Sequence, residues 1–263
     1  IDTQKLKLLR PAMMPYFYLK SAGSHIKELK RESISPDEFE THIKNEASRL
    51  KEIPDLYYKS GKWKGEMKGK YKAIAKKIEN NKELSKIYRA YEGALAKARL
   101  YDFEDMILEV GRVLGANREL LLMLEEEYQY ILADEHQDAN SSQNRLLELI
   151  SGFHKNPNLF IVGDEKQAIF RFQGASLENF LYFKKKYPDA LIVNLEENYR
   201  SGQALLDATQ TLISHSRLEE GFSDGALKAS SRSLGPKIKF AECYTNAHEY
   251  SFVAAFIKAK IAA

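Results

Sequence analysis

The sequence predicts an α/β protein in which a long helical region precedes a parallel sheet covered by helices. Two observations support this prediction. In residues 1–100, apolar side chains recur at spacings of three and four, as in Phe39, Ile43 and Leu50, which is the period of an amphipathic helix. From about residue 130, short apolar runs alternate with helical patterns, as in proteins whose strands are joined by crossover helices.

The helical region carries recognisable start signals. Ser35 can cap a helix, Pro36 fits the first helical position, and Glu38 completes a capping box. A second amphipathic pattern covers residues 84–100, and Asp102 is expected to cap the helix that follows it. These signals predict that the first hundred residues are almost entirely helical.

Four apolar runs are predicted to be strands, at residues 130–133, 159–162, 191–193 and 238–244. Helical patterns lie between them, so the strands are expected to run parallel. Ligand sites of such sheets form beyond the carboxyl ends of the strands, which directs attention to the residues after Ala133, Val162 and Leu195.

Charge is distributed unevenly along the chain. Residues 1–100 hold 23 Lys and Arg against 13 Asp and Glu, whereas residues 101–263 hold 17 against 24. A basic region on an acidic body indicates a surface for a polyanion such as nucleic acid. A highly charged helical surface without such a partner explains the same counts, and both interpretations stay open.

Membrane and secreted classes are not supported. No run approaches the roughly 18 apolar residues that a membrane span needs, and no leader pattern opens the chain. Cys243 is the single cysteine, so an internal disulfide is impossible. We therefore expect a cytoplasmic protein with no membrane partner.

Two adjacent acids, Asp134 and Glu135, follow the first predicted strand. Carboxylates at the end of a buried strand lose hydration unless something compensates, and Mg²⁺ is one such group. Asp134 could hold the metal directly or through water, and Glu135 could orient and deprotonate an attacking water. A polar cluster that caps the next helix is the alternative.

Polar residues also follow the second and third predicted strands. Gln167 can contact a terminal phosphate and a water together, and Arg200 could neutralise charge on a transferred phosphoryl group. Tyr199 could stack on a base. Taken alone, Gln167 is typical of a solvated surface residue, and Arg200 is typical of an Arg–Glu surface pair.

Between Gln167 and Tyr199, aromatic and polar residues alternate at Phe170, Arg171, Phe172 and Gln173. Such a pattern can stack unpaired bases, each stacked base contributing about 1–3 kcal/mol without regard to sequence. An ordinary strand with Phe170 and Phe172 in the core remains the alternative.

Taken together and in order, four segments resemble the superfamily-one DNA helicases of the UvrD/Rep/PcrA type. Residues 134–138 resemble motif II (D-E-x-Q-D), residues 162–175 resemble motif III, and residues 198–201 resemble motif IV. Residues 101–106 resemble the upstream L-D-F-x-D-L signature. The resemblance is close over residues 84–215 and looser in the flanks.

The resemblance implies a RecA-like parallel sheet of the P-loop NTPase type with a large all-helical inserted subdomain. Residues 1–92 would be that inserted, 1B-like subdomain, whose counterpart in the family touches duplex DNA. Residues 93–188 would complete the first RecA-like domain, and residues 189–263 would begin the second. ATP would lie between the two RecA-like domains.

The family's roles then fall on individual residues, with ATP and Mg²⁺ as cofactors. Asp134 and Glu135 would hold Mg²⁺, with Glu135 also activating water. Gln167 and Arg200 would contact the γ-phosphate, and Tyr199 the adenine. Single-stranded DNA would run along the aromatic segment, namely Phe170, Arg171, Phe172 and Gln173, although the family has Arg where this chain has Gln173.

The phosphate-binding loop G-x-x-x-x-G-K-[ST] does not occur in these residues, nor do the family's later motifs. We therefore expect a fragment with little ATPase activity of its own, from an ATP-dependent helicase that moves on single-stranded DNA and unwinds duplexes at junctions in repair or replication. A truncated non-catalytic DNA-binding protein, or the motor portion of a helicase–nuclease, are the alternatives.

Overall fold

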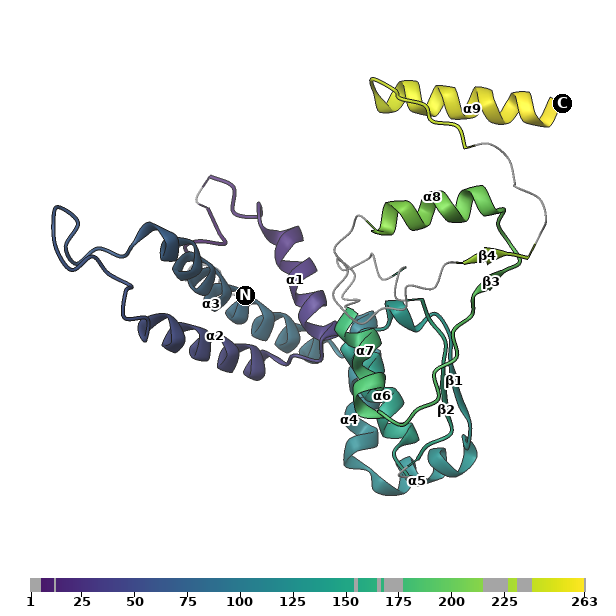
Figure 1. The fold of residues 1–263 in the computed structure, drawn as a ribbon. Coiled ribbons are helices and arrows are strands. Elements are labelled where there is room, and N and C mark those ends of the chain that lie inside the picture. The colour runs from purple at the N-terminus through teal and green to yellow at the C-terminus, as the bar shows by residue number, and fades with distance from the viewer. Residues whose placement is uncertain are drawn as a thin grey trace. The chain divides into compact units, whose positions relative to one another are not determined.

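The computed structural model describes residues 6–11, 13–153, 156–164, 167, 177–214, 227–230 and 238–262. The chain divides into two compact units, Ile1–Pro188 and Asp189–Ala263. Figure 1 shows helices dominating both units, with short strands in each.

The first unit begins with three helices, α1 (Leu19–Arg31), α2 (Pro36–Lys51) and α3 (Gly69–Ala98). The capping box predicted at Ser35 and Glu38 is present, with both side chains bonded to each other's backbone N–H. The apolar faces of the three helices meet in one core. That core consists of Ala22, Ile26, Phe39, Ile43, Leu50, Leu56, Ile78, Leu84 and Tyr88.

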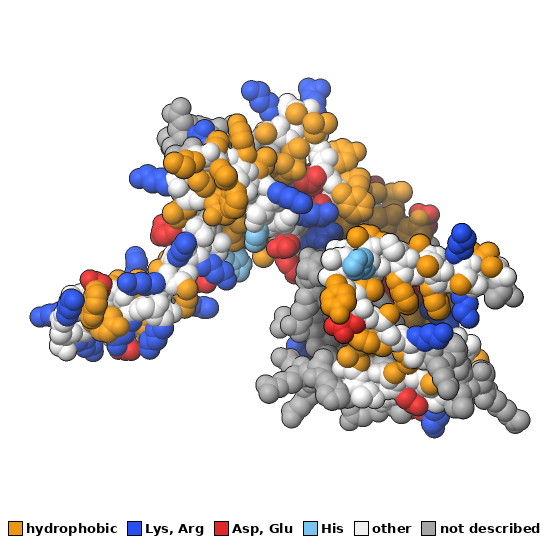
Figure 2. Space-filling model, turned by 90° about the horizontal axis from the view of Figure 1, so that it is seen from above, with side chains coloured by type: hydrophobic (Ala, Val, Ile, Leu, Met, Phe, Trp, Pro, Cys, Tyr) orange, Lys and Arg blue, Asp and Glu red, His pale blue; other side chains and the backbone are white. Residues whose placement is uncertain are grey.

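Residues 57–68, here called the lysine loop, join α2 to α3 and form a closed hairpin. Tyr57 and Met67 form an antiparallel bridge, and the Gly61 and Gly65 backbones adopt φ angles of 79° and 84°, which favour glycine. The loop holds four lysines and one acid. In Figure 2, Lys and Arg side chains gather at the left edge of the view. Figure 1 places the lysine loop at the same edge.

A buried cation joins three helices of the first unit. The Lys30 side chain, on α1, is 1% exposed, and its Nζ lies 2.7 Å from Glu92, 2.7 Å from Asp102 and 2.6 Å from Asp105. Burial alone lowers the pKa of Lys30, but its hydrogen bonds to the three carboxylates outweigh burial and hold the pKa above its ordinary value. The ammonium therefore stays charged in the interior.

The remainder of the first unit alternates helices and strands. Helices α4 (Phe103–Ala116) and α5 (Arg118–Glu127) precede β1 (Ile131–Ala133), and α6 (Ser141–Ser151) separates β1 from β2 (Leu159–Ile161). Helix α7 (Leu177–Lys186) follows. The two strands pair in parallel, with Ile131 opposite Leu159. Strands predicted at 130–133 and 159–162 are thus confirmed, one residue shorter at one end each.

The second unit contains β3 (Glu197–Asn198), α8 (Gln203–Ser214), β4 (Lys228–Ala229) and α9 (Asn246–Ala262). β3 and β4 pair in parallel. The strands predicted at 191–193 and 238–244 are wrong, because neither range is paired within the described chain. Leu191 is 91% exposed, so the burial that stabilises an apolar parallel strand is missing there.

The predicted fold class is therefore only partly confirmed. Parallel strands alternate with helices, but the described residues contain two sheets of two strands each rather than one larger sheet. The assignment of residues 1–92 as an inserted subdomain stays a prediction. None of the described helices combines the length and the apolar character that crossing a membrane requires.

Candidate nucleotide site

The carboxyl end of β1 carries a tight acidic turn. Asp134 Oδ1 accepts a hydrogen bond of 2.9 Å from the backbone N–H of Glu135, and both residues are exposed. Glu135 has φ 52° and ψ 36°, a left-handed conformation that non-glycine residues adopt at a cost of roughly 1–2 kcal/mol. Residues with such strained backbone conformations cluster at functional sites, so the conformation supports a functional role for Glu135.

Gln137 lies behind this turn and contacts both strand ends. Gln137 is 2% exposed and lies in the short 3₁₀ helix His136–Asp138 (η2). The Gln137 Nε2 donates to Glu135 Oε2 at 2.5 Å, and its Oε1 accepts from the backbone N–H of Asp164 at 3.1 Å. The acid after β1 is thereby connected to the loop after β2.

The loop after β2 continues this hydrogen-bonded chain. Gln167 Nε2 donates to Asp164 Oδ2 at 2.9 Å, and the Gln167 backbone N–H donates to the Asp164 carbonyl at 2.9 Å. Gln167 itself is exposed. The structure thus connects Glu135 to Gln167 through Gln137 and Asp164, which brings two predicted site residues into one network.

His136 anchors the turn from the inside. It is 2% exposed, its Nε2 lies 2.8 Å from Asn144 Oδ1, and its ring meets the Phe183 ring edge-on at 5.3 Å between centroids. Burial lowers the pKa of His136, and the Asn144 contact opposes that shift only in part. Its packing against Phe183 and its contact with Asn144 make His136 a structural group of this turn.

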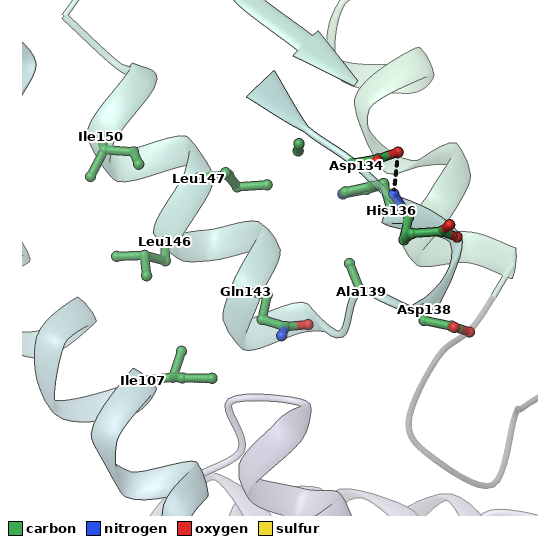
Figure 3. A pocket seen from close by; sticks show the side chains of 11 residues that line it. Ile107, Asp134, His136, Asp138, Ala139, Gln143, Leu146, Leu147 and Ile150 are labelled. Carbon is green, nitrogen blue, oxygen red and sulfur yellow. Dashed lines mark hydrogen bonds between the residues drawn. The ribbon is translucent and has the colours of Figure 1, made fainter. Parts of the chain in front are cut away.

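A cavity of about 460 Å³ opens beside the acidic turn. Figure 3 shows Ile107 from α4 and Leu146, Leu147 and Ile150 from α6 on one side, and Asp134, His136 and Asp138 on the other. Apolar side chains from two helices and carboxylates of the acidic turn therefore line the same cavity.

The donor set suits magnesium better than a structural metal. Within the described residues, no group of three or more His, Cys, Asp and Glu side chains is placed to share a metal ion. Zinc and calcium sites built from protein need such groups. Mg²⁺ keeps several waters and takes one or two carboxylates plus phosphate oxygens, so the Asp134–Glu135 pair fits it.

Tyr199 and Arg200 belong to the second unit. The Tyr199 hydroxyl donates to Glu197 Oε2 at 2.6 Å, and this bond raises the pKa of Tyr199. Asn198 Oδ1 accepts from the backbone N–H groups of Arg200 at 2.9 Å and Ser201 at 2.7 Å, which shapes the turn after β3. Convergence of these two residues on the first unit's acids stays a prediction.

The predicted DNA-contacting segment, Phe170, Arg171, Phe172 and Gln173, lies outside the described residues. Sequence reasoning assigned no role to Gln137 or Asp164, which the structure places between Glu135 and Gln167. The only available signal was position, because both residues lie in loops that follow predicted strands, and position alone does not show which polar side chains there are buried.

Two family models match the chain in succession. The UvrD/REP helicase N-terminal domain matches residues 5–188, and the UvrD-like helicase C-terminal domain matches residues 193–262. The chain belongs to the UvrD/REP helicase family. Membership implies the superfamily-one P-loop NTPase fold, and it agrees with the resemblance carried by the four motifs.

Curated relatives from this family support the assignment. A probable DNA helicase II homolog of Mycoplasma capricolum is 32% identical over 204 residues, 77% of this chain and 27% of the relative. The ATP-dependent DNA helicase PcrA of Leuconostoc citreum is 35% identical over 132 residues, and that of Staphylococcus epidermidis 34% over 167 residues. The matches cover 50% and 64% of this chain and 17% and 22% of those relatives. The chain thus spans about a quarter or less of the length of these relatives.

Proposed function

We propose that the protein to which this chain belongs is an ATP-dependent DNA helicase that moves on single-stranded DNA and unwinds duplexes at junctions, in repair or replication. The observation that carries the proposal is the hydrogen-bonded network between the ends of β1 and β2. It holds an acid suited to activating water and an amide suited to contacting phosphate on neighbouring loops.

Each residue of the site has a distinct chemical task in this proposal. Asp134 holds Mg²⁺ directly or through water, together with Glu135, and the ion when bound neutralises charge on the phosphate oxygens. Glu135 orients the attacking water and accepts its proton. Gln167 contacts the γ-phosphate, Arg200 stabilises the charge that develops there, and Tyr199 packs on the adenine.

DNA contacts are assigned to two parts of the first unit. Phe170, Arg171, Phe172 and Gln173 would lie along single-stranded DNA. Residues 1–92, as the 1B-like inserted subdomain, would face the duplex side of a junction, where their excess of lysine and arginine complements phosphate charge. Residues 93–188 and 189–263 would then contribute to the two RecA-like domains.

The deciding experiment measures DNA-stimulated ATP hydrolysis by the full gene product, with and without Glu135→Gln. This change keeps the shape of the side chain and removes its basicity. We expect kcat to fall by about a thousandfold while ATP binding persists, since a positioned base contributes roughly 10²–10⁴-fold. A hydrolysis rate within tenfold of the parent would refute Glu135 as the base.

The same assay separates the proposal from a non-catalytic DNA-binding protein. If the full gene product binds DNA and shows no ATP turnover that depends on magnesium and DNA, the motor assignment fails and the binding assignment remains. Magnesium titration completes the test, because Asp134→Ala should raise the magnesium concentration needed for half-maximal rate.

A further inference from the structure

We propose that Gln137 is a positioning residue that fixes the carboxylate of Glu135 and couples it to the loop after β2. The inference rests on the proposed function, because it takes Glu135 as the group that activates water. Gln137 itself is too deeply buried, at 2% exposure, to be expected to touch nucleotide. It acts through its two hydrogen bonds.

The two bonds require an amide in one orientation. Glu135 Oε2 offers only an acceptor, and the Asp164 backbone N–H offers only a donor. A side chain that serves both must present a donor and an acceptor from one planar group, as a primary amide does. Turning the Gln137 amide over would set oxygen against carboxylate and NH₂ against N–H, so a single orientation satisfies both partners.

The backbone around Gln137 holds this amide in place. The Ala139 N–H donates to the His136 carbonyl at 3.0 Å, and the His136 N–H donates to the Val162 carbonyl at 3.0 Å. The second of these bonds ties the turn to the end of β2. Glu135, in contrast, is exposed and would sample several rotamers without a partner.

The left-handed backbone at Glu135 has a reason in this arrangement. A conformation with φ 52° reverses the chain locally, so that the Glu135 carboxylate can meet a side chain two residues further on. The left-handed backbone and the Gln137 hydrogen bond therefore both hold the Glu135 carboxylate at the carboxyl edge of the strands.

The second bond extends the effect to the phosphate-contacting loop. Gln137 accepts from Asp164, and the carboxylate of Asp164 accepts from Gln167. If the loop after β2 moves, it therefore moves the whole Gln137 amide, including the Nε2 that donates to Glu135. Glu135 and Gln167 are positioned relative to each other by one buried amide.

Two variants in the full gene product test this role. Gln137→Glu keeps the shape and the acceptor for the Asp164 N–H, but it loses the donor to Glu135 and places a second carboxylate beside it. Gln137→Met keeps the approximate volume and loses both bonds. We expect kcat for DNA-stimulated ATP hydrolysis to fall about a hundredfold in both, as a misplacement of about 1 Å can produce, with KM for ATP within about threefold of the parent.

The matched control is Glu83→Gln, which alters another buried side chain that holds a distant segment. Glu83 accepts hydrogen bonds from the backbone N–H groups of Lys7, Leu8 and Leu9, far from the nucleotide site in the sequence. We expect it to lower the melting temperature while leaving kcat at saturating DNA unchanged, because the Glu83 carboxylate is buried against backbone N–H groups rather than presented to DNA. A purely structural Gln137 would behave in the same way.

The outcomes separate the inference from the proposed function. If Glu135→Gln loses activity but Gln137→Glu retains kcat within tenfold of the parent, the positioning role is wrong and the motor assignment stands. If Glu135→Gln remains active, Glu135 is not the base, and the positioning role, which rests on that assignment, is wrong with it; absence of turnover in the parent protein is the separate result that overturns the proposed function. As a last check, adding Gln137→Met to Glu135→Gln should cause no further loss, because a residue that acts through Glu135 has nothing left to position.

Discussion

The helical region of residues 19–98 and the strand-end region of residues 131–167 are stabilised in opposite ways. The first has a continuous apolar core and a buried ionic cluster at Lys30. The second has two paired strands whose central residues are exposed, Leu132 at 75% and Phe160 at 61%, and polar bonds join the loops that follow them. Stability therefore resides mainly in the helical region, and the proposed chemistry depends on geometry in the strand-end region.

This contrast has a practical consequence for mutagenesis. Substitutions in the helical core should change unfolding free energy and leave turnover per folded molecule intact. Substitutions in the Glu135–Gln137–Asp164–Gln167 network should do the reverse.

Lys30→Met should give the largest loss of stability. Removing the ammonium leaves the carboxylates of Glu92, Asp102 and Asp105 close together without their shared cation. Breaking a buried ion pair in this way costs about 3–5 kcal/mol. Urea unfolding followed by circular dichroism measures the change. A loss of unfolding free energy below about 1 kcal/mol would show that the Lys30 cluster is solvated. The contrast between the helical region and the strand-end region would then be smaller than described.

Ile78→Ala and Leu132→Ala form a matched pair across the two regions. Ile78 is 2% exposed in the helical core, so its truncation should cost about 2–5 kcal/mol. Leu132, at 75% exposure on β1, should cost no more than about 0.5 kcal/mol in the isolated chain. Thermal unfolding of both variants gives the comparison. Equal losses would mean that something covers the sheet in solution.

The sequence predicted the helical region better than the sheet, and the reason is physical. Helix boundaries depend on neighbouring residues, so the capping box at Ser35 and the cap at Asp102 could be predicted from the sequence. Strands at residues 191–193 and 238–244 depend on partners that are distant in the chain, and the described residues do not supply them.

The candidate site shows the same division. Asp134, Glu135 and Gln167 could be identified because they follow apolar runs, and strand ends are where ligands bind in such sheets. Gln137 could not be assigned a role, because a buried amide and an exposed one look identical in sequence. In the folded chain, its two polar atoms meet Glu135 and Asp164.

Trp63→Ala should weaken DNA binding without altering kcat at saturating DNA. Trp63 is 52% exposed on the lysine loop, beside the exposed Lys59, Lys62 and Lys64. Stacking of the ring on an unpaired base at the junction would contribute about 1–3 kcal/mol. Anisotropy of labelled junction DNA measures Kd, and Trp63→Phe is the control that keeps a ring. An unchanged Kd would remove this loop from the DNA surface.

Acid unfolding should depend on Asp102. Burial alone would raise the pKa of Asp102, but its bonds to Lys30, the Asp105 backbone N–H and Tyr91 lower it overall. Because the folded pKa lies below the unfolded one, its stabilisation is full above the unfolded pKa, about 3.9, and is lost as pH falls through the folded value. Each unit by which the pKa is lowered corresponds to about 1.4 kcal/mol of stability.

Melting temperatures measured from pH 6 to pH 2, a range of roughly four units, should fall less steeply in Asp102→Asn. An unchanged slope would contradict this assignment.

Two capping boxes, one in each region, allow the smallest and most discriminating test. Ser35 caps α2 in the helical region, and Asn140 caps α6 directly after η2. Either change to Ala should cost about 1 kcal/mol, because one side-chain acceptor for a helix N-terminus is lost in each case. Unfolding curves measure both losses.

Their effects on turnover should differ even where their effects on stability match. Ser35→Ala leaves the strand ends untouched, so kcat of the folded full gene product should stay at the parent value. Asn140→Ala frees the first turn of α6, which follows the segment that holds Gln137, and kcat should fall several-fold because Glu135 is held less firmly. Equal kcat values in the two variants would show that the network around Glu135 is rigid without its flanking helix, and would place the control of its geometry in Gln137 alone.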